Sequence, residues 1–91
     1  MHNLNCSFEK KIKKQLAKRG WTEESVKNLV TNPHRTVQTR DNRWKSDGSG
    51  RRDDPATAFI DDKGHYVVRN DLDGSIVPVS NINDPNWQTP F

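Results

Sequence analysis

The chain has 91 residues, of which 30% are hydrophobic and 30% are charged, and its formal net charge is +3. This length predicts one small domain over 1–91 with a thin core, which excludes a large enzyme with several sites. Its single cysteine excludes an internal disulfide and a cysteine-based zinc site, and no apolar run is long enough to span a membrane.

Positive charge is concentrated in the first half of the chain. Residues 1–52 hold 13 Lys and Arg against five Asp and Glu, whereas residues 53–91 hold two Lys and Arg against seven Asp. Such an asymmetry can steer a phosphate chain to one side of a molecule. The alternative interpretation is a Lys-rich helix whose charges are only solvated.

Two helices are predicted near the N-terminus. Four apolar residues recur there at every fourth position: Leu4, Phe8, Ile12 and Leu16. This period, followed by Gly20, predicts a helix over Asn5–Arg19. Thr22 is a natural N-cap for a second, short helix that ends before Pro33.

The remainder of the chain predicts an antiparallel sheet. A strand is expected over Arg35–Arg40, followed by a long loop over 41–54. Three strands separated by short turns then form two hairpins: Ala56–Asp61, His65–Asn70 and Ser75–Ser80. Pro78 cannot donate to a ladder, so the last strand should lie at a sheet edge or contain a bulge, and the tail from residue 82 should be irregular. The predicted fold is α+β, with two N-terminal helices packed on one face of a small antiparallel sheet.

The cations of the first predicted helix point in different directions. At about 100° per residue, Lys10 and Lys13 point into water. Lys11 lies on the flank of the apolar stripe, and Arg19 falls within the stripe if it is still helical. Their side chains either extend along the surface to reach water or line a cleft between helix and sheet.

Several short motifs resemble, in the same order, those of the colicin E5 ribonuclease domain family. They are Arg19-Gly20-Trp21-Thr22-Glu23, Asp54-Pro55-Ala56-Thr57, Tyr66-Val67-Val68-Arg69-Asn70-Asp71 and Asp84-Pro85-Asn86-Trp87. The resemblance implies a fold akin to barnase, EndoU and RelE. It also implies a ribonuclease without metal or other cofactor that cuts tRNA within the anticodon loop, which should leave 2′,3′-cyclic phosphate and 5′-hydroxyl ends.

The same resemblance implies a biological setting. Such domains are the C-terminal toxin domains of longer proteins. They are delivered from a secreted or cell-surface parent protein into the cytoplasm of a competing bacterium. In the producing cell, an immunity protein neutralises them. We expect that partner to be acidic, because it would cover a basic cleft, and we expect the free domain to be a monomer.

The resemblance also assigns roles to residues. The catalytic Lys and Arg of the family match Lys11 and Arg19. The family also places a cation in the loop before Asp54, and Lys45 fits that place with a one-residue gap. The other cations of that region stay open as alternatives: Arg40, Arg43, Arg51 and Arg52. A guanidinium stays protonated, so Arg19 suits a clamp on the phosphate. Lys11 would be the base for the 2′-hydroxyl if nearby cations and partial burial favour its neutral amine.

Further residues are candidates for substrate binding. They are Arg40, Arg43, Trp44 and Thr57. Trp44 would stack on an unpaired base or, alternatively, close over the core, and Thr57 would bond the substrate or only fill a strand position.

Other chemistry has weaker support in the sequence. His34 and His65 could act as acid and base, but nothing in the sequence makes them converge. Asp71-Leu72-Asp73-Gly74 is similar to the opening of a calcium loop but lacks the later Glu, so a hairpin turn explains it better and no metal is expected. Two alternative functions stay open: a RelE-like ribonuclease that acts on messenger RNA, and an RNA-binding module without catalysis.

Overall fold

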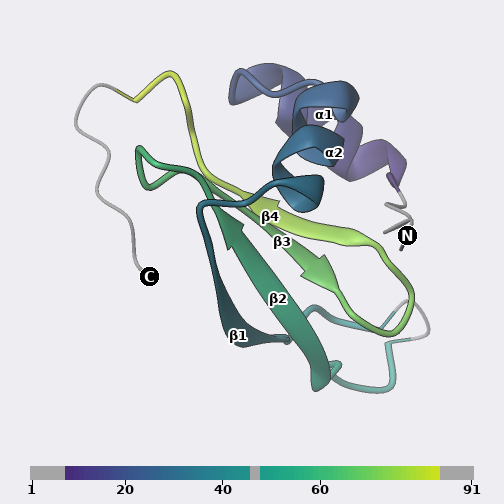
Figure 1. Ribbon diagram of the computed structural model, residues 1–91. Coiled ribbons are helices and arrows are strands. Elements are labelled where there is room, and N and C mark those ends of the chain that lie inside the picture. Colours follow the sequence, from purple (N-terminus) through teal and green to yellow (C-terminus); the bar gives the residue numbers. More distant parts are fainter. Residues whose placement is uncertain (1–7, 46–47, 85–91) are drawn as a thin grey trace.

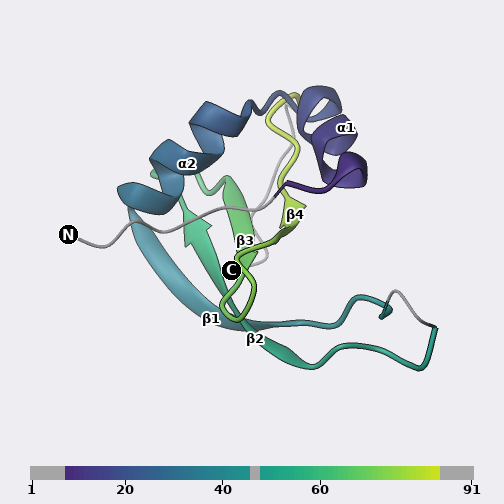
Figure 2. The ribbon, with the colours of Figure 1, turned by 90° about the vertical axis from the view of Figure 1, so that its right-hand side faces the viewer.

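The computed structural model describes residues 8–45 and 48–84, which form two helices and a four-stranded antiparallel sheet with strand order β1-β2-β3-β4. Both helices lie on one face of the sheet (Figures 1 and 2), which confirms the predicted α+β fold class. The elements are α1 (Lys10–Lys18), α2 (Glu23–Thr31), β1 (Arg35–Asp41), β2 (Asp54–Ile60), β3 (Tyr66–Asn70) and β4 (Ile76–Val79).

Helix α1 begins later than the sequence predicts. Phe8 and Glu9 precede the helix, and Glu9 has an extended backbone, so a start before Lys10 is wrong for the described residues; Leu4 lies outside them. Phe8 packs against the core from this non-helical position, and the ammonium of Lys27 lies 5.9 Å from its ring centroid. The apolar period of four residues therefore extends to a position before the helix, because Phe8 contacts the core without being helical. The predicted end is confirmed, since Gly20 takes a positive φ of 84° that favours glycine.

Helix α2 begins at the predicted cap. The Thr22 hydroxyl accepts a hydrogen bond from the backbone N–H of Ser25 at 3.0 Å, and the Ser25 hydroxyl accepts one from the Thr22 N–H at 2.9 Å. This reciprocal pair satisfies two backbone donors that the first turn would otherwise leave open. The cap therefore fixes the residue at which α2 begins.

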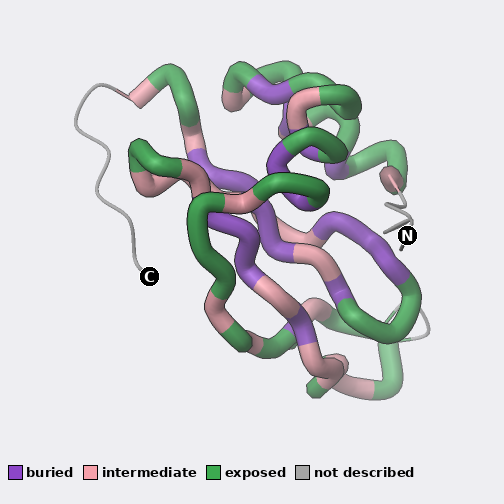
Figure 3. Tube along the Cα trace, viewed as in Figure 1, coloured by how far each residue is buried: buried purple, intermediate pink, exposed green. Residues whose placement is uncertain are grey.

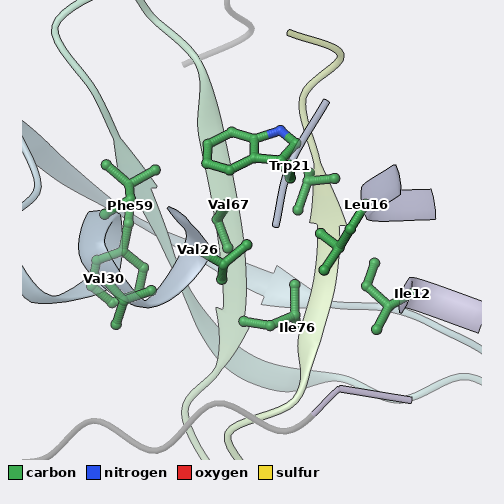
Figure 4. Close-up of a cluster of buried hydrophobic side chains, with 10 residues drawn as sticks. Ile12, Leu16, Trp21, Val26, Val30, Phe59, Val67 and Ile76 are labelled. Atoms are coloured by element: carbon green, nitrogen blue, oxygen red, sulfur yellow. The ribbon is translucent and has the colours of Figure 1, made fainter. Parts of the chain in front are cut away.

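The main core lies between the helices and the sheet, and Figure 4 shows its side chains converging from both layers. Its buried members are Ile12, Leu16, Trp21, Val26, Leu29, Val30, Phe59, Val67, Ile76 and Val79. The Trp21 indole N–H also donates to the Ser80 carbonyl at 2.8 Å, which ties the chain after α1 to the end of β4. In Figure 3 the buried trace follows β3, β4 and the inner sides of the helices, whereas the turns are exposed.

The predicted meander is confirmed, with strand ends shifted by one or two residues. β4 is an edge strand and its pairing with β3 contains a register shift, as the proline at position 78 predicts. The described part of the tail, residues 82–84, contains no helix or strand, and residues 85–91 lie outside the described part of the chain. Within the described ranges, no helix is long and apolar enough to cross a membrane.

In its described residues, 41–45 and 48–54, the long loop predicted over 41–54 is instead largely an extension of the β1–β2 hairpin. The Arg52 N–H donates to the Arg43 carbonyl at 2.7 Å, the Lys45 N–H donates to the Gly50 carbonyl at 2.8 Å, and Trp44 forms a β-bridge with Arg51. Figure 2 shows this segment projecting from the sheet on the side where α1 lies. It therefore forms a second wall beside the first helix.

Candidate active site

Two adjoining hollows lie beside α1, and we refer to them together as the basic cleft. The first, of about 330 Å³, is lined by Glu9, Lys11, Ile12, Gln15, Arg19, Arg43, Ile76, Val77 and Pro78. The second, of about 430 Å³, is lined by Glu9, Lys11, Arg43, Trp44 and Arg52. Three side chains line both, from the start of α1 and from the β1–β2 hairpin, so the two hollows are continuous along one surface.

Lys11 and Arg19 both line the first hollow, so of the two arrangements left open for these side chains the structure shows the one in a cleft between helix and sheet. They stand eight residues apart, which corresponds to roughly 12 Å along a helix axis, so they would contact different parts of a substrate. An Nη1–H of Arg19 donates to the Val79 carbonyl, so β4 holds one edge of the guanidinium. Lys11 is exposed, so the partial burial considered for it in the sequence is not found.

Arg43 is fixed in the cleft by a buried carboxylate. The Asp41 side chain is fully buried, and it accepts bonds from Arg43 Nε at 2.9 Å and Nη2 at 2.8 Å and from Asn70 Nδ2 at 2.8 Å. Burial opposes ionisation of Asp41, but these hydrogen bonds outweigh it and hold its pKa below the ordinary value. The hydrogen bonds to Asp41 raise the pKa of Arg43, although its burial opposes this. The hairpin wall therefore presents a cation whose position is set by β1 and β3.

A second arginine of the hairpin is held by the turn after β3. Arg52 Nη1 lies 2.9 Å from Asp73 Oδ2, and Ser75 donates to Asp73 Oδ1 through both its N–H, at 2.8 Å, and its hydroxyl, at 2.7 Å. Burial would raise the pKa of Asp73, but the bonds from Ser75 and Arg52 lower it to about 2. The β3–β4 turn thus fixes the position of a second arginine of the cleft.

These two carboxylates predict acid lability. A depressed pKa in the folded state stabilises the fold above the ordinary value near pH 4, and that contribution is lost as the pH falls towards about 2. We expect the free energy of unfolding to fall steeply between pH 4 and pH 2. We further expect Asp73→Asn to flatten this dependence, whereas Asp62→Asn, in the exposed β2–β3 turn, should leave it as in the wild type. Urea denaturation followed by circular dichroism measures this, and equal slopes for all three proteins would contradict it.

Trp44 is 65% exposed and lines the second hollow, so the alternative that it closes over the core is wrong. The Arg51 guanidinium lies 4.9 Å from the centroid of its ring and covers part of one face. Lys45, next to Trp44, takes part in the hairpin turn through its backbone and is not among the side chains that line either hollow.

Two other predicted substrate contacts lie outside the basic cleft. Arg40 pairs with Asp53 at 2.9 Å, and both side chains are exposed. The Thr57 hydroxyl donates to Asp71 Oδ1 at 2.9 Å. Of the seven predicted site residues, the structure therefore brings four to the cleft, namely Lys11, Arg19, Arg43 and Trp44.

Three polar residues of the cleft were not among the seven predicted site residues. Gln15 stands midway between Lys11 and Arg19 at four-residue spacing, a signal that was readable from the sequence. Arg52 was considered as a cation of the loop before Asp54, but its position in the cleft depends on the fold of the hairpin. Glu9 could not be placed while the helix was expected to begin before it.

The histidines and the acidic turn do not contribute to the cleft. His65 Nδ1 lies 3.1 Å from the Ser80 hydroxyl, and neither this residue nor His34 lines either hollow. Residues 71–74 form the hairpin turn between β3 and β4, as expected. Within the described ranges, no three His, Cys, Asp or Glu side chains are grouped as metal ligands would be.

Comparison with known proteins identifies the family. Residues 8–91 match the family model described as the Colicin E5 ribonuclease domain. The chain is 39% identical over 84 residues to Colicin-E5 of Escherichia coli, a match that covers 88% of this chain and 45% of that protein. It is 42% identical over 79 residues to the tRNA nuclease CdiA of Burkholderia pseudomallei, which covers 85% of this chain and 6% of that protein. The chain thus spans less than half of either relative, and over nearly its whole length it belongs to the colicin E5 ribonuclease domain family.

Proposed function

We propose that this chain is a metal-independent endoribonuclease toxin domain that cuts tRNA in the anticodon loop and leaves 2′,3′-cyclic phosphate and 5′-hydroxyl ends. The observation that carries the proposal is the basic cleft, in which Lys11 and Arg19 lie in one hollow of a ribonuclease-family chain. The name of one relative, a tRNA nuclease, supports tRNA as the substrate. Independence of metal rests on the family resemblance.

The chemistry of internal RNA cleavage defines what the cleft must supply. One group takes the proton of the 2′-hydroxyl, another protonates the leaving 5′-oxygen, and cations stabilise the dianionic phosphorane between them. Arg19 is the proposed clamp, because only an edge of its guanidinium is used by the Val79 carbonyl and further N–H donors are left for phosphate oxygens. Lys11, which lines the same hollow, is the proposed base for the 2′-hydroxyl.

The hairpin wall provides the proposed contacts to the rest of the RNA. Arg43 is held by Asp41 and would contact a phosphate next to the one that is cut. Trp44 is exposed and would stack on an unpaired base through the ring face that Arg51 leaves open. Lys45 stays the proposed third catalytic cation. In the free protein it lies at the hairpin turn and does not line either hollow, so bound RNA would have to draw its side chain towards the cleft.

Arg40 and Thr57 stay proposed substrate contacts outside the cleft. The ion pair of Arg40 with Asp53 is exposed, and such pairs contribute little stability, so a phosphate can replace Asp53 at small cost. The Thr57 hydroxyl can accept a hydrogen bond from RNA while it donates to Asp71.

The proposed setting is competition between bacteria. The domain would act as the tip of a toxin that is delivered from a secreted or cell-surface parent into the cytoplasm of a target cell. As a free domain it would be a monomer. Its proposed partner is an acidic immunity protein that covers the basic cleft.

This partner gives a prediction about kinetics. Electrostatic steering towards a basic cleft should make association fast at low salt and several-fold slower between 50 and 300 mM sodium chloride. Stopped-flow mixing of the domain with its immunity protein measures the rate. A fast rate that does not change with salt would contradict charge-driven recognition.

The experiment for the proposed function uses total cellular RNA and the purified chain in EDTA, with the 5′ ends of all fragments mapped. Cuts confined to tRNA anticodon loops are the expected result. Cuts spread over messenger RNA would replace the tRNA substrate with the RelE-like alternative. RNA that is bound but left intact would replace the enzyme with a binding module.

A further inference from the structure

We infer that Lys10 and Lys14, on the outer face of α1, bind the phosphate backbone of the RNA outside the basic cleft, on the paired stem next to the anticodon loop. We refer to these two residues as the outer lysine pair. The inference rests on the proposed ribonuclease function and deepens it, because it states which part of the tRNA is held outside the cleft. Neither residue is among the predicted site residues.

Hollows on both flanks of α1 show where the outer lysine pair lies. Lys11 lines the basic cleft on one flank, and Lys13 lines a separate hollow of about 160 Å³ beside Trp21 on the other flank. Lys10 and Lys14 line none of these hollows and are exposed. At about 100° per residue, Lys14 lies about 60° from Lys11 around the helix, and Lys10 lies about 40° beyond Lys14. The pair therefore extends the positive surface of the cleft onto the outer face of α1.

The charges of α1 oppose helix formation. Its nine residues include five Lys and no acidic residue. Lys10 and Lys11 begin the helix, where the positive end of the helix dipole disfavours cations. Lys14 stands three or four residues from Lys10, Lys11 and Lys18, and like charges at these spacings destabilise a helix. A polyanion bound along the outer face would offset both unfavourable contributions.

Partners within the described part of the chain do not compensate these charges. Among the residues of that part, no lysine of α1 forms an ion pair. Helix α2 is built differently, since it has a capping box and two acidic residues, Glu23 and Glu24, in its first turn. Lys18 also differs from the outer lysine pair, because it lies in the last turn, where the helix dipole favours a cation. The uncompensated cations are thus concentrated in the half of α1 that begins beside Lys11.

The place of the pair next to the cleft favours RNA as its partner. In the proposed reaction the anticodon loop occupies the cleft, and Lys11 lines both of its hollows. An RNA chain that leaves the cleft over Lys11 next meets Lys14 and then Lys10. Beyond the loop this chain enters the paired stem, which proteins contact mainly through phosphates and 2′-hydroxyls. Flexible ammonium groups suit such a contact, because it needs charge and no readout of bases.

The test removes both charges and compares two RNAs. One is the anticodon stem-loop of a tRNA that the mapped 5′ ends identify, and the other is an unpaired oligonucleotide with the sequence of its loop. We expect Lys10→Gln/Lys14→Gln to raise KM for the stem-loop about tenfold at unchanged kcat, and KM for the oligonucleotide less than about twofold. The melting temperature should stay the same or rise, because like charges are removed from α1.

Salt dependence gives an independent readout of the same contact. Binding of the stem-loop is measured with a 2′-deoxynucleotide at the cut, so that it stays intact. In the double variant the slope of log Kd against log salt concentration should fall by about 2, which is about 1 for each lost phosphate contact. An unchanged slope would overturn the inference even if the affinity had fallen.

The matched control is Lys13→Gln/Lys63→Gln, which removes the same charge from the other flank of α1 and from the exposed β2–β3 turn. KM for the stem-loop should then stay within about twofold of the wild type, which excludes an effect of net charge alone. Equal losses in the two double variants would overturn the proposal, as would equal losses of Lys10→Gln/Lys14→Gln on the two RNAs.

Two further outcomes assign a failure to its source. If Lys10→Gln/Lys14→Gln cuts the stem-loop like the wild type but associates more slowly with the immunity protein, the pair serves that protein and the RNA contact is overturned. If the wild type cuts no tRNA, the proposed function fails and this inference fails with it. If the wild type cuts tRNA and the variant does so with an unchanged KM, only this inference fails.

Discussion

Arg19→Ala is expected to slow RNA cleavage by about 100- to 1,000-fold, which is the usual loss when one charged donor to a transition state is removed. The loss should lie mainly in kcat, because the phosphorane carries more negative charge than the phosphate diester of the substrate. Single-turnover cleavage of tRNA measures it. The cleavage rate of Arg19→Lys should lie between those of the wild type and Arg19→Ala. In this variant a point charge replaces the planar guanidinium that the Val79 carbonyl orients.

The control for this prediction is Lys18→Ala, which removes a neighbouring cation that does not line either hollow. It should cut tRNA at close to the wild-type rate. Because the Arg19 side chain also bonds to β4, the melting temperature of each variant must be measured as well. A folded Arg19→Ala protein that cuts tRNA within threefold of the wild type would remove Arg19 from the mechanism.

Trp21→Ala is expected to lower the free energy of unfolding by about 3–5 kcal/mol, a large share of the stability of a small domain. Trp21 is 6% exposed within the main core, and its indole N–H bonds to the Ser80 carbonyl in a buried position. The substitution removes both the packing and the hydrogen bond. Urea denaturation followed by circular dichroism gives the value, and a loss below about 1 kcal/mol would contradict the described core.

A second variant at this position separates the two contributions. Trp21→Phe keeps most of the buried aromatic surface but leaves the Ser80 carbonyl without its donor, which should cost about 1–3 kcal/mol. A loss as large as that of the alanine variant would mean that the hydrogen bond, not the packing, dominates.

Local signals in the sequence were sufficient for much of the fold. Thr22 is of a residue type preferred at helix N-caps, and Pro78 lacks the N–H that a central strand needs, so its strand lies at an edge or contains a bulge. The start of α1 was missed because the apolar period extends to Phe8, which contacts the core from outside the helix. Period alone cannot distinguish a helical position from an extended one that reaches the same core.

The hairpin over 41–54 could not be predicted because its order depends on distant partners. Asp41 is held by Asn70, 29 residues later, and Arg52 by Asp73, 21 residues later. These contacts also fix the positions of two cations in the cleft, Arg43 and Arg52. By contrast, spacing placed Lys11 and Arg19 on or beside the apolar stripe of the first predicted helix, and the family resemblance selected the same two residues.

The central claim is that the basic cleft cuts RNA internally by transesterification within the tRNA anticodon loop. Mass spectrometry of the fragments from tRNA incubated with the chain in EDTA tests it most directly. The account predicts two fragments that meet in the anticodon loop, one ending in a 2′,3′-cyclic phosphate and the other beginning with a 5′-hydroxyl. Intact tRNA, or fragments that begin with a 5′-phosphate, would contradict it.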